Sequence, residues 1–244
     1  MIRIFGKSDK GLVRLTNEDS FRIIELSAEA HLAVVCDGMG GENGGDVASS
    51  TAVERISEMV SANFYPDMNQ NSIRDMLLTA IAAANAVIFS KSKEFEHLNG
   101  MGTTVIACMV VGNVSYIANA GDSRAYFLTN NEIVQITKDH TMVQMYIEQG
   151  KITEEEAKVH PQRHYITRAL GVNDKIDVDY CEMPLELGQK IIICTDGLTN
   201  YMDAQAILDA VKNNKPEHYT DILIDQAVNL GGADNITVVL IEAK

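Results

Sequence analysis

The sequence predicts an α+β fold in which layers of β-sheet are covered by helices. Short β-branched runs bounded by Gly, Asp or Asn recur along the chain, and two pairs of helical segments interrupt them. A sheet or an amphipathic helix has to bury its apolar face against another element, so this order of elements favours packed layers. With 244 residues, of which 46% are hydrophobic, the chain can bury a sizeable core.

The clearest strands form a hairpin. The runs TTVIACMVV and VSYIANA are joined by Gly112-Asn113, a two-residue turn signature. Residues 97–121 contain no Asp, Glu, Lys or Arg, but the Asn, Gly and Thr residues among them argue against a membrane span. Further strands are expected at 21–26, 32–36, 124–128, 133–136, 176–180, 191–194 and 236–241.

The helices are expected as two pairs. In the first pair, apolar residues recur at helical spacing at positions 52, 56, 59 and 60, and again at 73, 77, 81, 84 and 88. The second pair is expected over about 203–211 and 216–230, with Pro216 suited to a first turn and Gly231 to the position after the end. Residues 139–167 are polar and predict a surface insertion with short helices, one capped by Thr153 and Glu156.

Composition excludes some classes of function. The chain has 34 Asp and Glu against 20 Lys and Arg, a net charge of −14, whereas a nucleic-acid-binding surface needs clustered Lys and Arg. The amino terminus lacks a secretory signal, so we expect a cytoplasmic protein with neither nucleic acid nor membrane as a partner. We expect reduced core thiols, without a CxxC pair, at Cys36, Cys108, Cys181 and Cys194.

Four carboxylates stand where an apolar run meets a turn. They are Asp37 in AVVCDG, Asp122 in ANAGD, Asp196 in IIICTDG and Asp234 in GGADN. Asp-Gly alone is usually an ordinary turn, but four such ends can bring their carboxylates to one rim of a sheet. Clustered carboxylates raise one another's pKa unless a cation neutralises them. Oxygen donors without Cys or His favour Mg²⁺ or Mn²⁺ over zinc.

Two such ions about 3.5–4 Å apart would lower the pKa of a bridging water and hold a phosphoryl group for in-line attack. The string SDKGLVRLTNEDS adds Arg14, Glu18 and Asp19. The planar guanidinium of an arginine can bind two oxygens of one phosphate, although a single arginine in a sequence is more often a charged surface residue. The run DGMGGENGG matches neither nucleotide-binding glycine pattern, so we expect it to turn the backbone tightly and bring a carbonyl such as that of Gly38 near an ion.

Eight strings then carry a resemblance that covers residues 8–239. In chain order they are SDKGLVRLTNED, VVCDGMGG, NGMGTTV, ANAGDSRAY, TKDHT, ITRALG, IICTDGL and ADNITVV. Together they resemble the metal-dependent Ser/Thr protein phosphatases of the PPM (type 2C) family, in its bacterial single-domain form. The resemblance implies one domain over 1–244, built as a four-layer α-β-β-α sandwich of two mainly antiparallel β-sheets flanked by helices. Residues 139–167 correspond to the family's flap, which influences the choice of substrate.

The resemblance also implies a centre of two Mn²⁺ or Mg²⁺ ions at one end of the sandwich. By position, Asp37 looks like the carboxylate that bridges the two ions, and Gly38 like the residue that lends a carbonyl. Asp196 and Asp234 correspond to further ligands of one ion. Asp122, together with Asp196, is similar to the pair that holds a third, weaker ion.

Other positions match residues around the ions. Glu18 and Asp19 would contact metal-bound waters, and Arg14 corresponds to the phosphate-binding arginine. Asn235 follows Asp234, and the two together resemble the family's DN pair. An asparagine at such a position is at least as often a turn residue that hydrogen-bonds the backbone.

Met39 stands where eukaryotic members carry a histidine proposed as general acid, and Met cannot donate a proton. A metal-bound water or a flap histidine would then protonate the leaving group. His140 and His164 are the candidates, although such residues are more often structural or on the surface.

The function implied is hydrolysis of phosphoserine and phosphothreonine on proteins by in-line attack of a metal-bridging hydroxide. The enzyme would be a monomer that opposes Ser/Thr kinases. Two alternatives are a pseudophosphatase that only binds phosphoproteins and a phosphohydrolase of small phosphate esters. Every ligand position carries the expected acid, which favours the active enzyme. Because a chain of charge −14 repels phosphoproteins and two divalent ions offset four of those charges, substrate binding should depend on metal.

Overall fold

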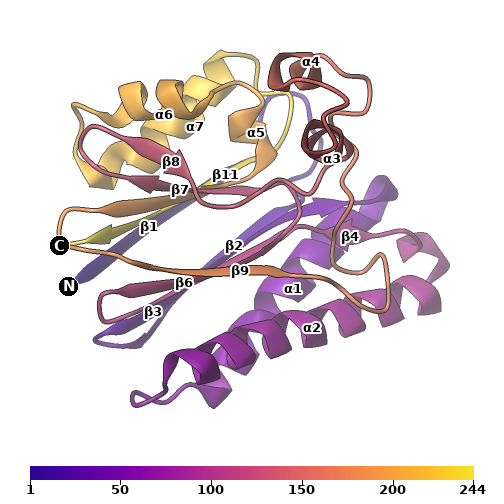
Figure 1. Cartoon of the computed structure of the whole chain (residues 1–244). Helices are drawn as coiled ribbons and strands as arrows, with labels where there is room; N and C mark the ends of the chain where they lie inside the picture. The colour runs from indigo at the N-terminus through magenta and orange to yellow at the C-terminus, as the bar shows by residue number, and fades with distance from the viewer.

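Two antiparallel β-sheets lie face to face, with helices on their outer faces (Figure 1). The computed structural model covers residues 1–244 and describes every side chain except those of residues 41–43. Through the thickness of the molecule, the layers follow the order α, β, β, α (Figure 1). The predicted α+β sandwich is therefore confirmed.

The strands form two separate sheets in which all named neighbours are antiparallel. The first sheet has the order β1 (Ile2–Asp9), β11 (Ile236–Ala243), β10 (Lys190–Cys194), β7 (Arg124–Leu128) and β8 (Ile133–Gln135). The second sheet has the order β2 (Asp19–Ser27), β3 (Ala30–Met39), β5 (Val105–Val111), β6 (Val114–Ala120) and β9 (Asp179–Pro184), and the short β4 (Gly102–Thr103) pairs with the end of β3.

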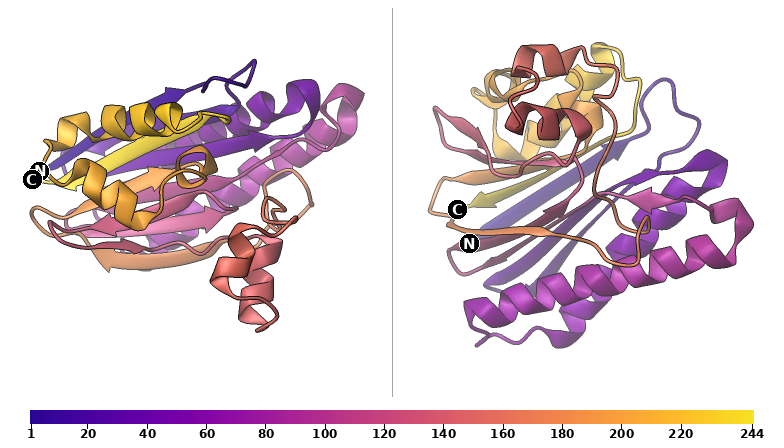
Figure 2. Two further views of the ribbon diagram at one scale, coloured as in Figure 1. Left: turned by 90° about the horizontal axis from the view of Figure 1, so that it is seen from above. Right: turned by 45° about the vertical axis from the view of Figure 1, so that its right-hand side comes forward.

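The helices divide between the two outer faces and one end. The second sheet is covered by α1 (Gly41–Asn63) and α2 (Gln70–Glu94), and the 3₁₀ turn η1 (Glu96–Leu98) follows α2. The first sheet is covered by α5 (Asp196–Thr199), α6 (Ala204–Val211) and α7 (Tyr219–Asn229), with η2 (Pro216–His218) leading into α7. Two short helices, α3 (Met142–Glu148) and α4 (Glu154–Lys158), lie at the end of the sandwich away from the chain termini (Figure 2).

Three apolar layers hold these elements together. Along β3, Leu32, Val34 and Cys36 face α1 and α2, whereas Ala33 and Val35 face the other sheet. The layer between the sheets also contains Ile106, Ile117, Ile191, Ile193 and Val239. A third layer lies under α5, α6 and α7. Central strands are buried on both faces, which explains why the sequence shows them as continuous apolar runs.

Several local predictions are confirmed. Val111 pairs with Val114 across the Gly112-Asn113 turn, where Gly112 has a positive φ of 59°. Thr153 and Glu156 form the capping box of α4. All four cysteines are free thiols, and only Cys181 is not fully buried.

Three predictions were wrong or incomplete. The strand β1 was missed, because its Gly6-Lys7-Ser8 segment breaks the apolar pattern and its partner β11 lies at the far end of the chain. The strand expected at 176–180 is β9 at 179–184, because Ile176 and Val178 pack against the α1–α2 core instead of pairing with β6. The helix expected over 216–230 is divided into η2 and α7.

Among the described residues, α2 is the one helix that passes a test of length and apolar composition for crossing a membrane. Its apolar side chains, including Ile73, Leu77, Ile81 and Ile88, are buried against α1 and the second sheet. The burial identifies α2 as a core helix, a class that passes the same test.

Asn85 is a buried amide on α2 that fixes the segment leading from residues 139–167 into β9. Its Oδ1 accepts from the Gly171 N–H at 2.8 Å, and its Nδ2 donates to the carbonyls of Asn173 and Asp174 at 3.0 and 3.2 Å. Three backbone groups therefore depend on one side chain.

We predict that Asn85→Ala lowers the free energy of unfolding by about 2–3 kcal/mol, because the buried Gly171 N–H loses its acceptor. Asn214→Ala removes an exposed bond to the Ala210 carbonyl and serves as the matched control, with an expected effect within about 0.5 kcal/mol. Urea unfolding measures both, and equal losses would contradict the role assigned to Asn85.

Candidate metal centre

The four predicted carboxylates meet at the end of the sandwich where α3 and α4 lie. Asp37 lies near the end of β3, and Asp196 begins α5 directly after β10. Asp122 follows β6, and Asp234 precedes β11. Asp19 opens β2 and is the direct cross-strand partner of Asp37. Antiparallel pairing within both sheets thus brings the beginnings and the ends of strands to one rim.

Burial and mutual repulsion raise the pKa of these carboxyl groups. Burial raises the pKa of Asp37 well above its usual range, and the charges of Asp19, Asp196, Asp122 and Asp234 add to this. Burial likewise raises the pKa of Asp19 to about 7 and that of Asp122 to about 8. The pKa of Asp196 is raised by burial and then by Asp234. The cluster therefore carries more negative charge than the basic side chains nearby neutralise.

Two buried carboxylate oxygens have no protein partner. The Oδ2 of Asp19 accepts from the hydroxyls of Thr195 and Thr237 at 2.9 and 2.7 Å, but its Oδ1 has no donor. The Oδ1 of Asp122 also lacks one. A buried acceptor without a partner is unfavourable, and native structures seldom leave one without an ion or a water.

These features fit a hard divalent cation. The donors are oxygens, which Mg²⁺ and Mn²⁺ prefer, and a cation would relieve the repulsion and reach the unpartnered oxygens. Within the described part of the chain, no three Asp, Glu, His or Cys side chains form a ligand group by themselves. An ion bound here would complete its coordination with backbone carbonyls and water, as Mg²⁺ commonly does.

Arg14 stands beside this cluster on the loop between β1 and β2. Its Nη2 lies 2.8 Å from Oδ2 of Asp234, and the arginine side chain is half exposed. The hydrogen bond to Asp234 raises the pKa of Arg14 further. Glu18, at the other end of the loop, has its pKa raised by burial, with Arg14 acting in the opposite direction. The loop thus carries both a cation and an acid to the rim.

Asn235 holds this loop at both ends. The side chain is buried, its Oδ1 accepts from the Glu18 N–H at 2.8 Å, and its Nδ2 donates to the carbonyls of Lys10 and Thr16 at 2.9 Å each. Asn235 therefore bonds the backbone of a distant loop, unlike a turn residue that bonds the backbone beside it. Asn235 also places Asp234, the preceding residue, next to the loop.

Gly38 is required by close approach rather than by an unusual φ. A Cβ added there would lie 2.1 Å from the Gly45 carbonyl oxygen and 2.6 Å from that of Glu18. The expected tight turn lies at Gly40, where φ is +119°. The part of the glycine-rich run at 41–43 lies outside the described side chains.

Sequence reasoning missed the threonines around the carboxylates. Besides Thr195 and Thr237, Thr103 donates to the Asp37 carbonyl, and the Thr104 hydroxyl accepts from the Asp37 N–H, each at 2.9 Å. These residues stand inside the strings TDG, NITV and GTTV, beside the acids. Their position next to the acids was the available signal, but a threonine has no catalytic signature of its own.

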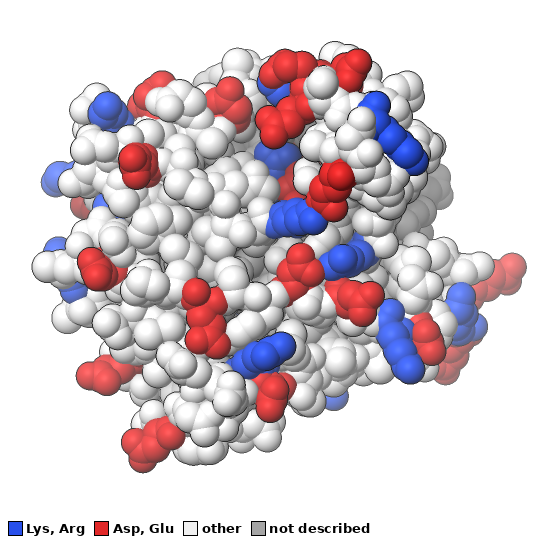
Figure 3. Space-filling view, viewed as in Figure 1, with Lys and Arg blue, Asp and Glu red and all other residues white. Residues whose placement is uncertain are grey.

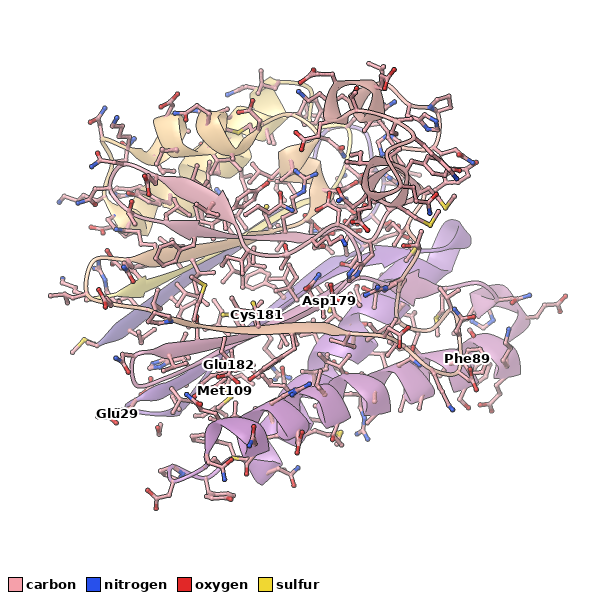
Figure 4. The ribbon with its side chains drawn as sticks, in the orientation of Figure 1. Glu29, Phe89, Met109, Asp179, Cys181 and Glu182 are labelled. Carbon is pink, nitrogen blue, oxygen red and sulfur yellow. The ribbon has the colours of Figure 1, made fainter. Side chains whose placement is uncertain are left out.

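The two candidate histidines differ in their surroundings. His140 is buried, and its Nδ1 accepts from the Gly121 N–H at 3.1 Å. Its Nε2 lies 3.1 Å from both Asp179 and Arg168, and Asp179 is the first residue of β9 (Figure 4). Both ring nitrogens are engaged, so His140 is structural. His164 is exposed and lies near Asp196.

A groove of about 660 Å³ opens beside the carboxylates. It lies between the α3–α4 segment and the α5–α6 region, and both Asp122 and Asp196 border it. Acidic and basic side chains mix over the corresponding face of the molecule (Figure 3). The remaining lining includes Thr141, Gln144, Lys158, Arg163, His164 and Asn200.

The raised pKa values predict how metal-free stability depends on pH. A carboxyl group whose pKa is higher in the folded than in the unfolded state binds its proton more tightly when folded, so its contribution to stability is lost as pH rises from about 4 to about 8. In EDTA, Asp122→Asn should therefore melt about 5 °C or more above the wild type at pH 8.5 and close to it at pH 4.5.

Thermal unfolding followed by circular dichroism measures this difference. Asp67→Asn, at an exposed position between α1 and α2, is the control and should shift the midpoint little at either pH. A wild type that is as stable as Asp122→Asn at pH 8.5 would contradict the assigned repulsion.

Comparison with known proteins places the chain in a family. A protein-family model described as Protein phosphatase 2C matches residues 13–227. The chain is 36% identical over 237 residues to the serine/threonine phosphatase stp of Listeria welshimeri, covering 97% of this chain and 94% of that protein.

Two solved structures are similar over nearly the whole length. The S. agalactiae serine/threonine phosphatase has a TM-score of 0.94 and 31% identity, with all of both chains covered. The catalytic domain of the phosphatase PstP, described in complex with two manganese ions, has a TM-score of 0.85 and 33% identity, covering 99% of this chain and 97% of that one. Because the family model matches most of the chain and a 36% identical relative is covered over 94% of its length, the chain belongs to the protein phosphatase 2C (PPM) family.

Proposed function

We propose that this protein is a metal-dependent phosphatase that removes phosphate from phosphoserine and phosphothreonine residues of proteins. The observation that carries the proposal is the cluster of buried, mutually repelling carboxylates next to an exposed arginine. Relatives named as serine/threonine phosphatases support the substrate class. The bridging-hydroxide mechanism is part of the proposal.

The proposal assigns the ligands by position. Asp37 would bridge the two core ions, the carbonyl of Gly38 would be a further ligand, and Asp196 and Asp234 would be ligands of one of the ions. Asp122 and Asp196 would hold a third ion, which agrees with the unpartnered Oδ1 of Asp122. Mn²⁺ or Mg²⁺ is the expected ion, and the two manganese ions of the related PstP structure support this choice.

When bound, the two ions supply positive charge to the phosphoryl oxygens and lower the pKa of water into the neutral range. Asp19 and Glu18 would accept hydrogen bonds from the ordered waters, since the Oδ1 of Asp19 faces no protein donor. The threonine hydroxyls fix Asp19, and Thr103 and Thr104 fix the backbone of Asp37. These contacts keep the acceptors in place during turnover.

Arg14 would bind the substrate's phosphoryl oxygens and orient them toward the carboxylate cluster. Its pairing with Asp234 holds the guanidinium at the rim, while half of its side chain stays open to a ligand. The planar fork of the guanidinium suits two oxygens of one phosphate. Protonation of the leaving oxygen falls to an ordered water or to His164, because both nitrogens of His140 are engaged.

The groove supports a protein substrate over a small ester. It continues from the carboxylates along residues 139–167, the proposed flap, and can hold residues next to the phosphorylated one. We therefore propose phosphorylated proteins, including Ser/Thr kinases and their targets, as partners of a cytoplasmic monomer. A pseudophosphatase is disfavoured, because each proposed ligand position carries its acid.

Hydrolysis of a phosphothreonine peptide should require Mn²⁺ or Mg²⁺ and stop in EDTA. Asp37→Asn and Asp196→Asn should each lower kcat by about 100-fold or more, since each removes a charge from the proposed core site. Phosphate release measures the rate, and Asp67→Asn is the matched control. A folded protein without turnover in any metal would move the assignment to a phosphoprotein-binding pseudoenzyme.

Arg14→Ala should lower kcat/KM for the peptide about 10- to 100-fold, because charge-assisted bonds to phosphate are lost. Arg14→Lys keeps the charge but not the fork and should recover only part of this loss. Arg55→Ala, at an exposed i,i+3 pair on α1, is the control. Full activity of Arg14→Ala would show that Arg14 does not bind the substrate phosphate.

A further inference from the structure

The loop that carries Arg14 exposes three large apolar side chains, Leu12, Val13 and Leu15, here called the apolar rim. Their exposed fractions are 68%, 66% and 93%. Single exposed apolar residues are ordinary on a protein surface, but among the described residues the other large exposed ones do not share a four-residue segment. The apolar rim is therefore a candidate site for contact with another molecule.

Hydrogen bonds and close packing of the loop backbone keep the apolar rim exposed. Asn235 bonds the carbonyls of Lys10 and Thr16 at the two ends of the loop, and the Leu12 N–H donates to the Gly232 carbonyl at 2.7 Å. Gly11 has φ +75°, and a Cβ there would lie 2.2 Å from the Asp234 carbonyl oxygen. The loop is thus pressed against the Asp234 segment and cannot turn its apolar side chains into a core.

The apolar rim surrounds the proposed phosphate-binding residue. Arg14 lies between Val13 and Leu15 in the chain and reaches Asp234 at the carboxylate cluster. The two views of Figure 2 place the β1–β2 loop and the α3–α4 segment on opposite sides of the same end of the sandwich. A polypeptide whose phosphorylated side chain reaches the cluster from this end can contact the β1–β2 loop.

The size of the apolar rim favours a peptide segment as its occupant. Three side chains on one short loop cannot supply the roughly 800 Å² that each partner buries in a stable protein–protein interface. They can cover one or two side chains of a substrate. Apolar substrate residues gain most there, since the three side chains offer no hydrogen-bonding group to a polar residue.

We propose that Leu12, Val13 and Leu15 bind apolar side chains next to the phosphorylated residue of a phosphoprotein, and so give the enzyme a preference for phosphorylation sites with apolar flanks. This inference rests on the proposed phosphatase function. It adds a substrate preference that metal ligation alone does not provide.

The test uses two phosphothreonine peptides that differ only in having leucines or serines at the positions flanking the phosphothreonine. Each is assayed by phosphate release in Mn²⁺, and the ratio of the two kcat/KM values cancels changes in the metal centre. The wild type should prefer the leucine peptide by about fivefold or more. Leu15→Ser, and more strongly Leu12→Ser with Leu15→Ser, should bring the ratio toward one.

Leu187→Ser is the matched control, because Leu187 is 83% exposed in the connection between β9 and β10, at the end of the molecule that holds the chain termini. It should retain the wild-type ratio. A wild type without preference, or a ratio unchanged in the Leu12 and Leu15 variants, overturns the inference and leaves the phosphatase function standing. A wild type that hydrolyses neither peptide overturns both. If the Leu12 and Leu15 variants sediment differently from the wild type but keep its ratio of kcat/KM values, the apolar rim makes contacts between copies of the chain. That result also overturns the inference.

Discussion

Repulsion among the carboxylates at one end of the sandwich is the constraint on which the rest of this structure depends. Asp37, Asp19, Asp196 and Asp122 are buried, which raises the pKa of each, and the charge of at least one neighbouring carboxylate raises each pKa further. A chain without a strong scaffold would relax by separating these groups. The repulsion lowers the stability of the metal-free fold, and a cation that relieves the repulsion would bind more tightly for that reason.

The scaffold supplies that stability through its layers. Both faces of the central strands are buried, so that β3, β10 and β11 cannot shift in register without moving apolar side chains out of three cores. Threonine hydroxyls and the Asn235 amide then fix the acids and the Arg14 loop through bonds to specific atoms. The same fixed loop leaves the apolar rim exposed beside Arg14, so the proposed substrate contacts and the proposed metal site share one support.

The sequence predicted the parts of this fold that carry local signals. The hairpin at Gly112-Asn113, the capping box at Thr153 and the carboxylates at strand ends all depend on residues close together in the chain. The strand β1 was missed because its pairing with β11 is a long-range interaction that rescues a polar segment. The threonines around Asp19 and the clamp at Asn235 likewise depend on contacts between distant segments. Metal-ligand and substrate roles came from resemblance and stay proposals.

We expect the carboxylate cluster to exchange protons for divalent cations. Isothermal titration of the metal-free protein with Mn²⁺ at pH 7, in two buffers of different ionisation enthalpy, gives the number of protons released per ion bound. Because burial raises the pKa of Asp19 to about 7, that of Asp122 to about 8 and that of Asp37 well above its usual range, we predict release of about one proton or more at pH 7. Mn²⁺ binding without proton release at pH 7, or no binding at all, would contradict it.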